Sequence, residues 1–578
     1  MPGKRCYAVL LLIILMGCQN WNWNTRSDKP KIQPPPFPEL KTVGTYTSFL
    51  GVEPIRVYGL GIVHDLPGTG SNPPPGAARQ QALRQLKQLG VSAPEEVLNS
   101  KELAVVQVSA LIQPGAYRDD RIDVEIEALG DDKNIDLRGG TLIHCELFEY
   151  ADANQLLGRP NQGQRMLSHK KLVKAEGPVM CVADDKDPQP RRKGVVWAGG
   201  RVLENISFDL IMNKEHQEAR LAMLIANHIN QRFHGRVNEH AMRGMAEAQT
   251  KTVIKLRAPE NYRLNWGRYL LVIRQIPMVD NPNVLRDLRK KYAEDLLNPE
   301  FSLVAALQLE ALGADVAPEL KAGLKHPHPK VRFFAAEALA YLGDPSCAEV
   351  LAESAKSFPD YRAYALTALA SMDEAVAQIK LRELMTENQP DLRYGAFRAL
   401  QVMNARDRTI PCEVINQRFN LYRVTNDSKP MVHVCTNSRP DIVIFGSEPM
   451  IQSPFSLTAG PDFVITAKEG EDKCFISKIS LQGGHTQDVA SLKLSDIIRK
   501  MGAMGAHYND IVDLLKQADK LQNLTCSFAM DALPQAPNLE TLAQSDPMTP
   551  GTIKPSPANK SLFEGWSFTP ALFARRHD

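Results

Sequence analysis

The sequence lacks the short signatures of several enzyme and metal-binding classes. It contains no Cys-x-x-Cys pair, which argues against a zinc ribbon or a thioredoxin-like site. It has no Gly-x-Ser-x-Gly nucleophile elbow, and no Ser/His/Asp set can be assembled from it. A net charge of +2 over 578 residues gives no field of the kind that nucleic-acid binding needs. We therefore expect a protein that is not an enzyme, uses no metal or cofactor and binds no nucleic acid.

Long apolar runs are also missing, apart from a short one at the N-terminus. Lys4 and Arg5 precede the apolar run 7–16, which is too short to span a bilayer but suits the core of a signal peptide. The run ends at Leu15-Met16-Gly17-Cys18, which resembles a bacterial lipobox. We predict a lipoprotein-type signal peptide over 1–18, with Cys18 as the lipidation site. The alternative is an ordinary signal peptide that is cut nearby; either way the chain is exported, and a Pro-rich tether over 19–41 follows.

Seven cysteines remain beyond Cys18. Export permits disulfides, and three pairs are plausible by neighbourhood alone, although connectivity cannot be deduced from sequence. These pairs are Cys145 with Cys181, Cys412 with Cys435, and Cys474 with Cys526; Cys347 is left over.

A repeated pattern of Ala and Leu occupies the second half of the chain. Its four copies begin at Ser302, Arg332, Arg362 and Arg393, at spacings of 30, 30 and 31 residues. A fixed period of this length is typical of stacked helical pairs that bury their apolar stripes against their neighbours. We predict a HEAT-like helical-repeat module over 291–408, with Leu342-Gly343-Asp344-Pro345 as a turn between two units. Such a module binds a partner or holds other parts of an assembly apart, and it rarely performs catalysis.

Three of the four copies begin with an arginine, at Arg332, Arg362 and Arg393. Because the arginines recur at the same position of each copy, we expect each to pair with a carboxylate or a helix-end carbonyl of the next unit. A ligand-binding groove lined by these arginines is the alternative.

The segments on either side of the repeats mix strands and helices. Alternating apolar residues predict half-buried antiparallel strands over 103–111, 121–128, 195–197, 207–211, 253–256 and 269–276. Helices are predicted over 77–89 and 214–233, the second with a stripe of Ala219, Ala222, Met223, Ala226 and Ile229. After the repeats, 413–415, 431–434, 441–444 and 463–466 are predicted strands, 494–501 and 509–518 a helical hairpin, and 533–578 a disordered tail. The fold class is therefore a multidomain α+β protein, with antiparallel-sheet-rich halves flanking an α-helical array.

Several residue groups resemble ligand sites, but their spacing argues against each one. The glycines from Gly59 to Gly70 lack the Gly-Lys-Ser/Thr ending of a phosphate loop, so we expect them to form turns. His228, His234 and His240 are six residues apart and would not share a helix face. His326 and His328 are expected in an exposed loop. Asp119, Asp120 and Asp123 lack the spacing of a calcium loop, so with Arg118 and Arg121 they are expected to mark a charged sheet edge.

The two flanking segments resemble the flagellar P-ring protein family. In the first, the resemblance lies in the strings at 58–63, 68–70, 121–124, 129–133 and 137–142 and in the helix at 226–233; in the second, it lies at 441–446, 497–503 and 510–518. The Arg-Ile-Asp-Val string at 121–124 and the Leu-Arg-Gly-Gly-Thr-Leu string at 137–142 are fairly specific together. The resemblance divides the chain into P-ring-like regions over 42–290 and 409–532. The family lacks the helical repeats between them, and its members usually carry an ordinary signal rather than a lipobox.

The resemblance implies a periplasmic structural subunit of the flagellar basal body. Many copies would form a closed ring, a passive bushing around the rod, with the rod, the L-ring protein and peptidoglycan as expected neighbours. A ring of identical subunits needs two different complementary faces on each subunit, and a bearing needs no catalytic group. The alternative is a periplasmic lipoprotein adaptor that binds a partner protein through its helical repeats.

Overall fold

The computed structural model describes residues 40–71, 73, 75–129, 132, 134–149, 170–181, 191–238, 241–405, 407–436, 439–480, 484–545, 547–548 and 568–573. The predicted signal peptide, Cys18 and the tether up to residue 39 lie outside these ranges. Thr42–Asp578 forms one compact unit. Within the described ranges, no helix combines the length and the hydrophobicity that crossing a bilayer requires.

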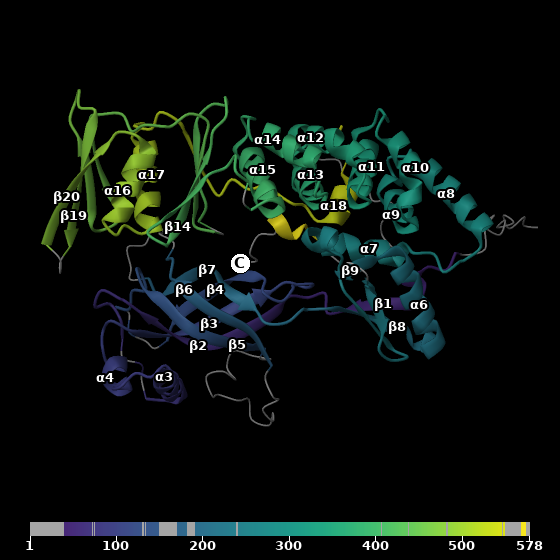
Figure 1. The fold of residues 1–578 in the computed structure, drawn as a ribbon, viewed down its shortest axis with the longest axis horizontal. Coiled ribbons are helices and arrows are strands. Elements are labelled where there is room, and N and C mark those ends of the chain that lie inside the picture. Colours follow the sequence, from purple (N-terminus) through teal and green to yellow (C-terminus); the bar gives the residue numbers. More distant parts are fainter. Residues whose placement is uncertain are drawn as a thin grey trace, which may run out of the picture. The chain divides into compact units, whose positions relative to one another are not determined.

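Six strands close into an antiparallel barrel in the order β2-β3-β4-β7-β6-β5 (Figure 1). In β4, Val124 and Ile126 are buried while Glu125 and Glu127 are exposed, which confirms the predicted alternation. The predicted charged sheet edge is wrong, because β4 pairs with β3 on one side and β7 on the other. The strands are β2 (Ile55–His64), β3 (Ala104–Ile112), β4 (Arg121–Ala128), β5 (Thr141–Glu149), β6 (Lys171–Pro178) and β7 (Lys193–Val202); helices α3 (Ala77–Gln88) and α4 (Pro94–Leu98) accompany them.

Two of the glycines predicted to form turns lie inside a barrel strand. Gly59 and Gly61 belong to β2, and a Cβ on Gly59 would come within 2.4 Å of the Glu146 carbonyl oxygen. Neighbouring strands therefore approach β2 too closely for a side chain at this position. Gly68, with φ of 77°, does lie in a turn.

A four-stranded sheet follows in the order β1-β8-β12-β11. Helix α6 is shorter than the predicted 214–233, because a 3-10 turn precedes it and Gln217 and Glu218 separate the two. Met223 is 61% exposed, so the predicted stripe is wrong there and Ile225 is buried instead. The elements are α2 (Val43–Tyr46), β1 (Thr47–Leu50), β8 (Phe208–Met212), η1 (Lys214–His216), α6 (Ala219–Arg232), β11 (Ala246–Ala248) and β12 (Val253–Leu256), with β9 (His234–Asn238) paired to β10 (Ala241–Gly244).

The apolar run at 269–276 is a helix, and the strand predicted there is wrong. It belongs to α7 (Trp266–Gln275), which follows the 3-10 helix η2 (Glu260–Asn265). Residues 267–273 are all buried, Arg268 among them, so this stretch lacks the exposed positions that would reveal a helical period. Periodicity cannot distinguish a short, fully buried helix from a buried strand.

Helices α8 to α15, called the array below, follow one another through the second part of the chain (Figure 1). The four sequence copies fall on α9, α11, α13 and α15, whose residues are largely buried. The predicted turn is present: Gly343 has φ of 78°, and a new helical turn begins at Pro345. Assignment of the array to the HEAT class remains a prediction. The helices are α8 (Pro282–Leu296), α9 (Ser302–Leu312), η3 (Ala314–Val316), α10 (Ala317–Gly323), α11 (Pro329–Tyr341), η4 (Pro345–Cys347), α12 (Ala348–Ser357), α13 (Pro359–Ser371), α14 (Ala375–Leu384) and α15 (Pro390–Met403).

Two sheets and a helical hairpin share one apolar core after the array. The five-stranded sheet has the order β13-β14-β16-β15-β21 and the four-stranded sheet the order β17-β18-β19-β20. All four strands predicted here and the hairpin are present. The elements are β13 (Cys412–Ile415), β14 (Phe419–Val424), β15 (Met431–Val434), β16 (Asp441–Phe445), β17 (Phe455–Ala459), β18 (Phe463–Ala467), β19 (Lys473–Ser480), β20 (Gly484–Ser491), α16 (Leu494–Ala503), α17 (Tyr508–Lys520) and β21 (Ser527–Met530).

The disordered tail predicted from residue 533 is wrong for the part that the structure describes. Residues 539–544 form helix α18 (Leu539–Gln544), and a 3-10 turn, η5 (Ala571–Phe573), follows the buried Phe568. The composition, rich in Pro and polar residues, misled the prediction. Among the described residues, Leu539, Leu542, Phe568, Leu572 and Phe573 are buried against the rest of the chain.

None of the seven cysteines beyond residue 40 forms a disulfide in the structure, so the three pairs that were plausible by neighbourhood are not formed. Cys145, Cys181, Cys347, Cys435 and Cys474 are buried among apolar side chains. Burial raises the pKa of Cys145 and of Cys181 to about 12, since the thiolate would lose its hydration. These two thiols are core residues and are not poised to react.

Candidate functional site

A buried arginine joins the segment before the array to the array itself. Asn265 caps α7, its side chain accepting from the Arg268 backbone N–H at 3.4 Å, and the Arg268 side chain then points out of the helix into the array. Its Nη2 lies 2.6 Å from Glu310 Oε2 on α9, and its Nη1 lies 2.6 Å from Glu337 Oε2 on α11. All three side chains are 0% exposed. One cation therefore ties α7 to the first two repeat helices.

Three tyrosines surround this group of charges. The Tyr262 hydroxyl, from η2, donates to Glu310 Oε1 at 2.6 Å. Its ring stacks on Tyr341 of α11 with centroids 4.8 Å apart, and the Arg268 guanidinium lies 5.1 Å from the Tyr341 centroid. Tyr269 packs against Tyr262 at 5.6 Å. We call Tyr262, Arg268, Glu310, Glu337 and Tyr341 the junction.

Burial controls the protonation of the junction. Loss of hydration raises the pKa of Glu337 to about 7; the Arg268 charge opposes this rise and the Glu310 charge adds to it. For Arg268, burial alone would lower the pKa, but the charges of Glu310 and Glu337 outweigh burial and hold the pKa above its usual value. Arg268 carries one positive charge, whereas Glu310 and Glu337 together would carry two negative charges. A proton on Glu337 removes one of these, so that the net charge of the three side chains is zero. The junction is suited to rigid attachment, and it contains no nucleophile or metal site.

The repeated arginines do contact backbone carbonyls, but chiefly those just before their own helix: Arg362 and Arg393 reach the end of the preceding helix, and Arg332 reaches the loop before α11. Arg332 donates to the His326 carbonyl oxygen at 2.9 Å, Arg362 to that of Ala355 at 2.8 Å and Arg393 to that of Met385 at 3.1 Å. Arg362 also pairs with Asp391 of the following repeat helix, as the prediction required. Arg393, the last of the series, instead reaches the Lys429 carbonyl at 3.0 Å, beyond the array. The arginines are structural links between successive helices.

Replacing Arg362 with methionine is expected to destabilise the protein by about 2–3 kcal/mol, because the Ala355 carbonyl and Asp391 lose a charged donor. Arg332→Met is the matched control, since Arg332 is half-buried and its bonds go only to loop carbonyls. Urea denaturation followed by far-UV circular dichroism measures both. Equal midpoints for the two variants would contradict the role given to Arg362.

The residues weighed as ligand sites do not come together. Asp120 pairs with Arg263, Asp119 with Arg201, and Asp123 accepts from the Ala198 backbone N–H at 2.8 Å. His326 and His328 are half-buried, not exposed, and the His328 side chain accepts from the backbone N–H of Lys330 at the start of α11. Across the residues that the structure describes, no group of His, Cys, Asp or Glu could hold a metal ion.

The histidines at 228 and 234 lie on different elements, because α6 ends at Arg232. His228 lies on α6, buried, with its Nε2 3.6 Å from an Asp280 carboxylate oxygen. His234 already belongs to β9, and His240 lies outside the described residues.

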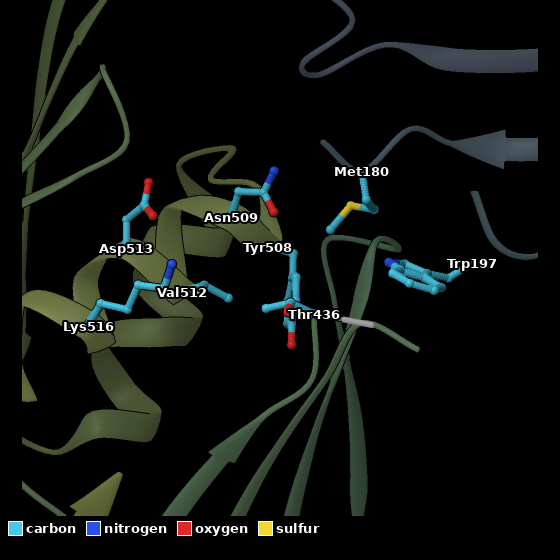
Figure 2. A pocket seen from close by; sticks show the side chains of 8 residues that line it. All are labelled: Met180, Trp197, Thr436, Tyr508, Asn509, Val512, Asp513 and Lys516. Carbon is cyan, nitrogen blue, oxygen red and sulfur yellow. The ribbon is translucent and has the colours of Figure 1, made fainter. Parts of the chain in front are cut away.

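A small cavity lies between Met180 and Trp197 on one side and the start of α17 on the other (Figure 2). Its volume is about 10 Å³, so it has room for roughly one water molecule. Thr436, Tyr508, Asn509, Val512, Asp513 and Lys516 complete its wall. A cavity of this size cannot hold a substrate.

The sequence interpretation missed the junction, although a signal existed. Arg268 interrupts an otherwise apolar run, and Glu310 and Glu337 each stand within a helix of Ala and Leu. A charge within a fully apolar segment predicts a buried partner, since an unpaired buried charge costs several kcal/mol. Which charges pair across 42 residues cannot be read from the sequence.

Comparison with known proteins finds a match for the segment that contains the barrel, the sheet β1-β8-β12-β11, α6 and α7. Residues 43–284 match the family model described as "Flagellar P-ring protein". Over these residues the chain is similar to flagellar P-ring proteins. We call residues 43–284 the P-ring region. Tyr262 and Arg268 lie inside the P-ring region, whereas Glu310 and Glu337 lie beyond its end.

Individual relatives cover parts of this chain. A flagellar P-ring protein 1 of Chromobacterium violaceum is 41% identical over 98 residues, which are 17% of this chain and 26% of that protein. Flagellar P-ring proteins of Helicobacter acinonychis and Helicobacter pylori are 22% and 24% identical over 41% of this chain and 61% of theirs. The chain thus spans between about a quarter and three fifths of these relatives. The family match ends at residue 284, so the second P-ring-like region, over 409–532, remains a prediction.

Proposed function

We propose that this chain is a structural subunit of the flagellar basal-body P ring, which forms a periplasmic ring and serves as a bushing around the rod. The observation that carries the proposal is the family match over 43–284, a range that includes the whole barrel and the sheet beside it. A closed barrel leaves few free strand edges and makes a stiff building block, as a bearing requires. Neighbouring copies, the rod and the L-ring protein are the proposed partners.

Electron microscopy of basal bodies isolated from cells with and without this protein tests the proposal. We expect the ring at the level of peptidoglycan to be absent without the protein and to return when the protein is supplied. Basal bodies that keep an intact P ring without it would overturn the proposal. They would favour the adaptor alternative, in which the array binds a partner protein.

We propose that the array lies at the outside of the ring. Deleting the array also removes part of the junction. Removing 291–408 takes both Glu310 and Glu337 from Arg268 and exposes the face of α7 that packs on the array. The deletion chain should therefore keep Arg268 and Tyr262, because water can hydrate their polar groups on the newly exposed face. If the array projects outward, rings built from this chain will have a smaller outer diameter; an unchanged diameter would exclude that placement.

Lipidation at Cys18 is part of the proposal, motivated by the Leu15-Met16-Gly17-Cys18 string. Labelled palmitate should enter the wild-type chain and not a Cys18→Ala chain. Equal labelling of the two chains would exclude Cys18 as the site.

A further inference from the structure

Two segments of the tail, residues 533–545 and 568–573, lie on the array. Pro534 is buried against Gly395 of α15, where an added Cβ would come within 2.6 Å of the proline ring. The Tyr364 hydroxyl of α13 lies 2.7 Å from the Pro537 carbonyl oxygen and 3.1 Å from that of Phe568. Lys330 of α11 donates to the carbonyl oxygens of Ala543 and Ser545. The tail thus runs past α15, α13 and α11 in turn.

Apolar side chains of the tail complete this contact. Leu542 of α18 is 0% exposed, and Leu539 is 3% exposed and donates its backbone N–H to the Phe568 carbonyl at 3.2 Å. The Phe568 ring packs edge-on against Trp266 at 5.1 Å. A Cβ on Gly267 would come within 2.6 Å of Phe568, so α7 is also shaped for this ring. The tail therefore contacts both the array and the P-ring region.

The kind of contact resembles that of a peptide held by a binding surface. Side-chain donors of the array bind backbone carbonyls of the tail, and two glycines leave space for Pro534 and Phe568. In other peptide-binding surfaces, hydrogen bonds to the peptide backbone supply affinity, and pockets that fit particular side chains supply selectivity. We call Gly267, Lys330, Tyr364 and Gly395 the tail seat.

We propose that the tail seat is a peptide-binding surface whose resident ligand is this chain's own C-terminal segment, which acts as a displaceable latch between the array and the P-ring region. Covalent attachment gives the segment a high effective concentration, so it occupies the seat within its own chain. An unlatched chain would present the seat to the same segment of another copy. The proposal does not depend on ring formation.

The test uses full-length chains and a labelled synthetic peptide of residues 533–573. Leu542→Asp places a charge in the buried face of α18 and should release the latch, whereas Gln535→Asp adds the same charge at an exposed tail position. Fluorescence anisotropy should show saturable binding of the peptide to the Leu542→Asp chain. Wild type and Gln535→Asp should bind it at least about tenfold more weakly, because their seats are filled.

Hydrogen exchange read by mass spectrometry provides the second measurement. Amides of 539–545 should exchange at least about tenfold faster in Leu542→Asp than in Gln535→Asp. Tyr364→Phe keeps the ring and removes only the hydroxyl, so it should show a smaller increase in the exchange rate of the same segment. This variant provides the test if Leu542→Asp does not fold. Unchanged exchange in the folded variants, or peptide binding that is equal in all chains, would overturn the proposal.

Discussion

Arg268→Met is expected to be among the most destabilising single substitutions in this chain. It leaves Glu310 and Glu337 buried with no cation between them, and breaking a buried pair in this way costs about 3–5 kcal/mol. Because Arg268 belongs to the P-ring region and both partners belong to the array, the loss should loosen the contact between them. Urea denaturation at pH 7.5, followed by far-UV circular dichroism, should show a clear shift of the midpoint.

Arg289→Met is the matched control for this experiment. Arg289 pairs with Glu319 within the array at 2.6 Å, but the two side chains are 32% and 24% exposed. A pair of this kind contributes about 0–1 kcal/mol, because water screens it and its side chains lose entropy. A triple variant, Arg268→Met with Glu310→Gln and Glu337→Gln, should recover part of the loss. Equal effects of Arg268→Met and Arg289→Met would refute the role of the junction.

Much of the fold follows from local sequence patterns. Strands with one face on a core alternate strictly, as in β4. The repeat helices show a fixed period, and three of the four, α11, α13 and α15, start with proline. The strand β4 and the repeat helices α9, α11, α13 and α15 are present where these signals predict them. The resemblance of 58–63, 121–124 and 137–142 to the P-ring family also leads to the region that the family model matches.

The failures share a physical cause, because each depends on contacts between distant segments. Residues 269–276 form most of a helix that packs against η2, α2 and α9, and no local period records that environment. The tail contains few apolar residues, yet Phe568 and Leu542 find partners far away in the sequence. Arg268 reaches Glu310 and Glu337 through the same long-range packing. Only the folded chain specifies these pairings.

The junction also makes stability depend on pH near neutrality. Glu337 has its pKa raised from 4.5 to about 7 by burial, so the folded chain holds a proton that the unfolded chain has released. Arg268 and Glu310 face this carboxyl from α7 and α9, and Tyr341 and Tyr364 face it from α11 and α13. Between pH 4.5 and about 7, the folded state binds more protons than the unfolded state. The stability of the folded state therefore falls as pH rises through this range. The full loss is on the order of 3 kcal/mol.

Glu337→Gln is expected to remove this slope. The amide keeps the shape of the side chain and carries no charge, so it resembles the protonated carboxyl that burial favours. The variant should therefore match wild type near pH 5 and be the more stable of the two at pH 8, where wild type must bury a second carboxylate charge beside Glu310. Urea midpoints measured from pH 5 to 8 on both chains isolate this contribution, because all other titrating groups are common to them. Parallel curves would show that Glu337 is ionised in the folded chain throughout this range, with Arg268 balancing it despite the burial.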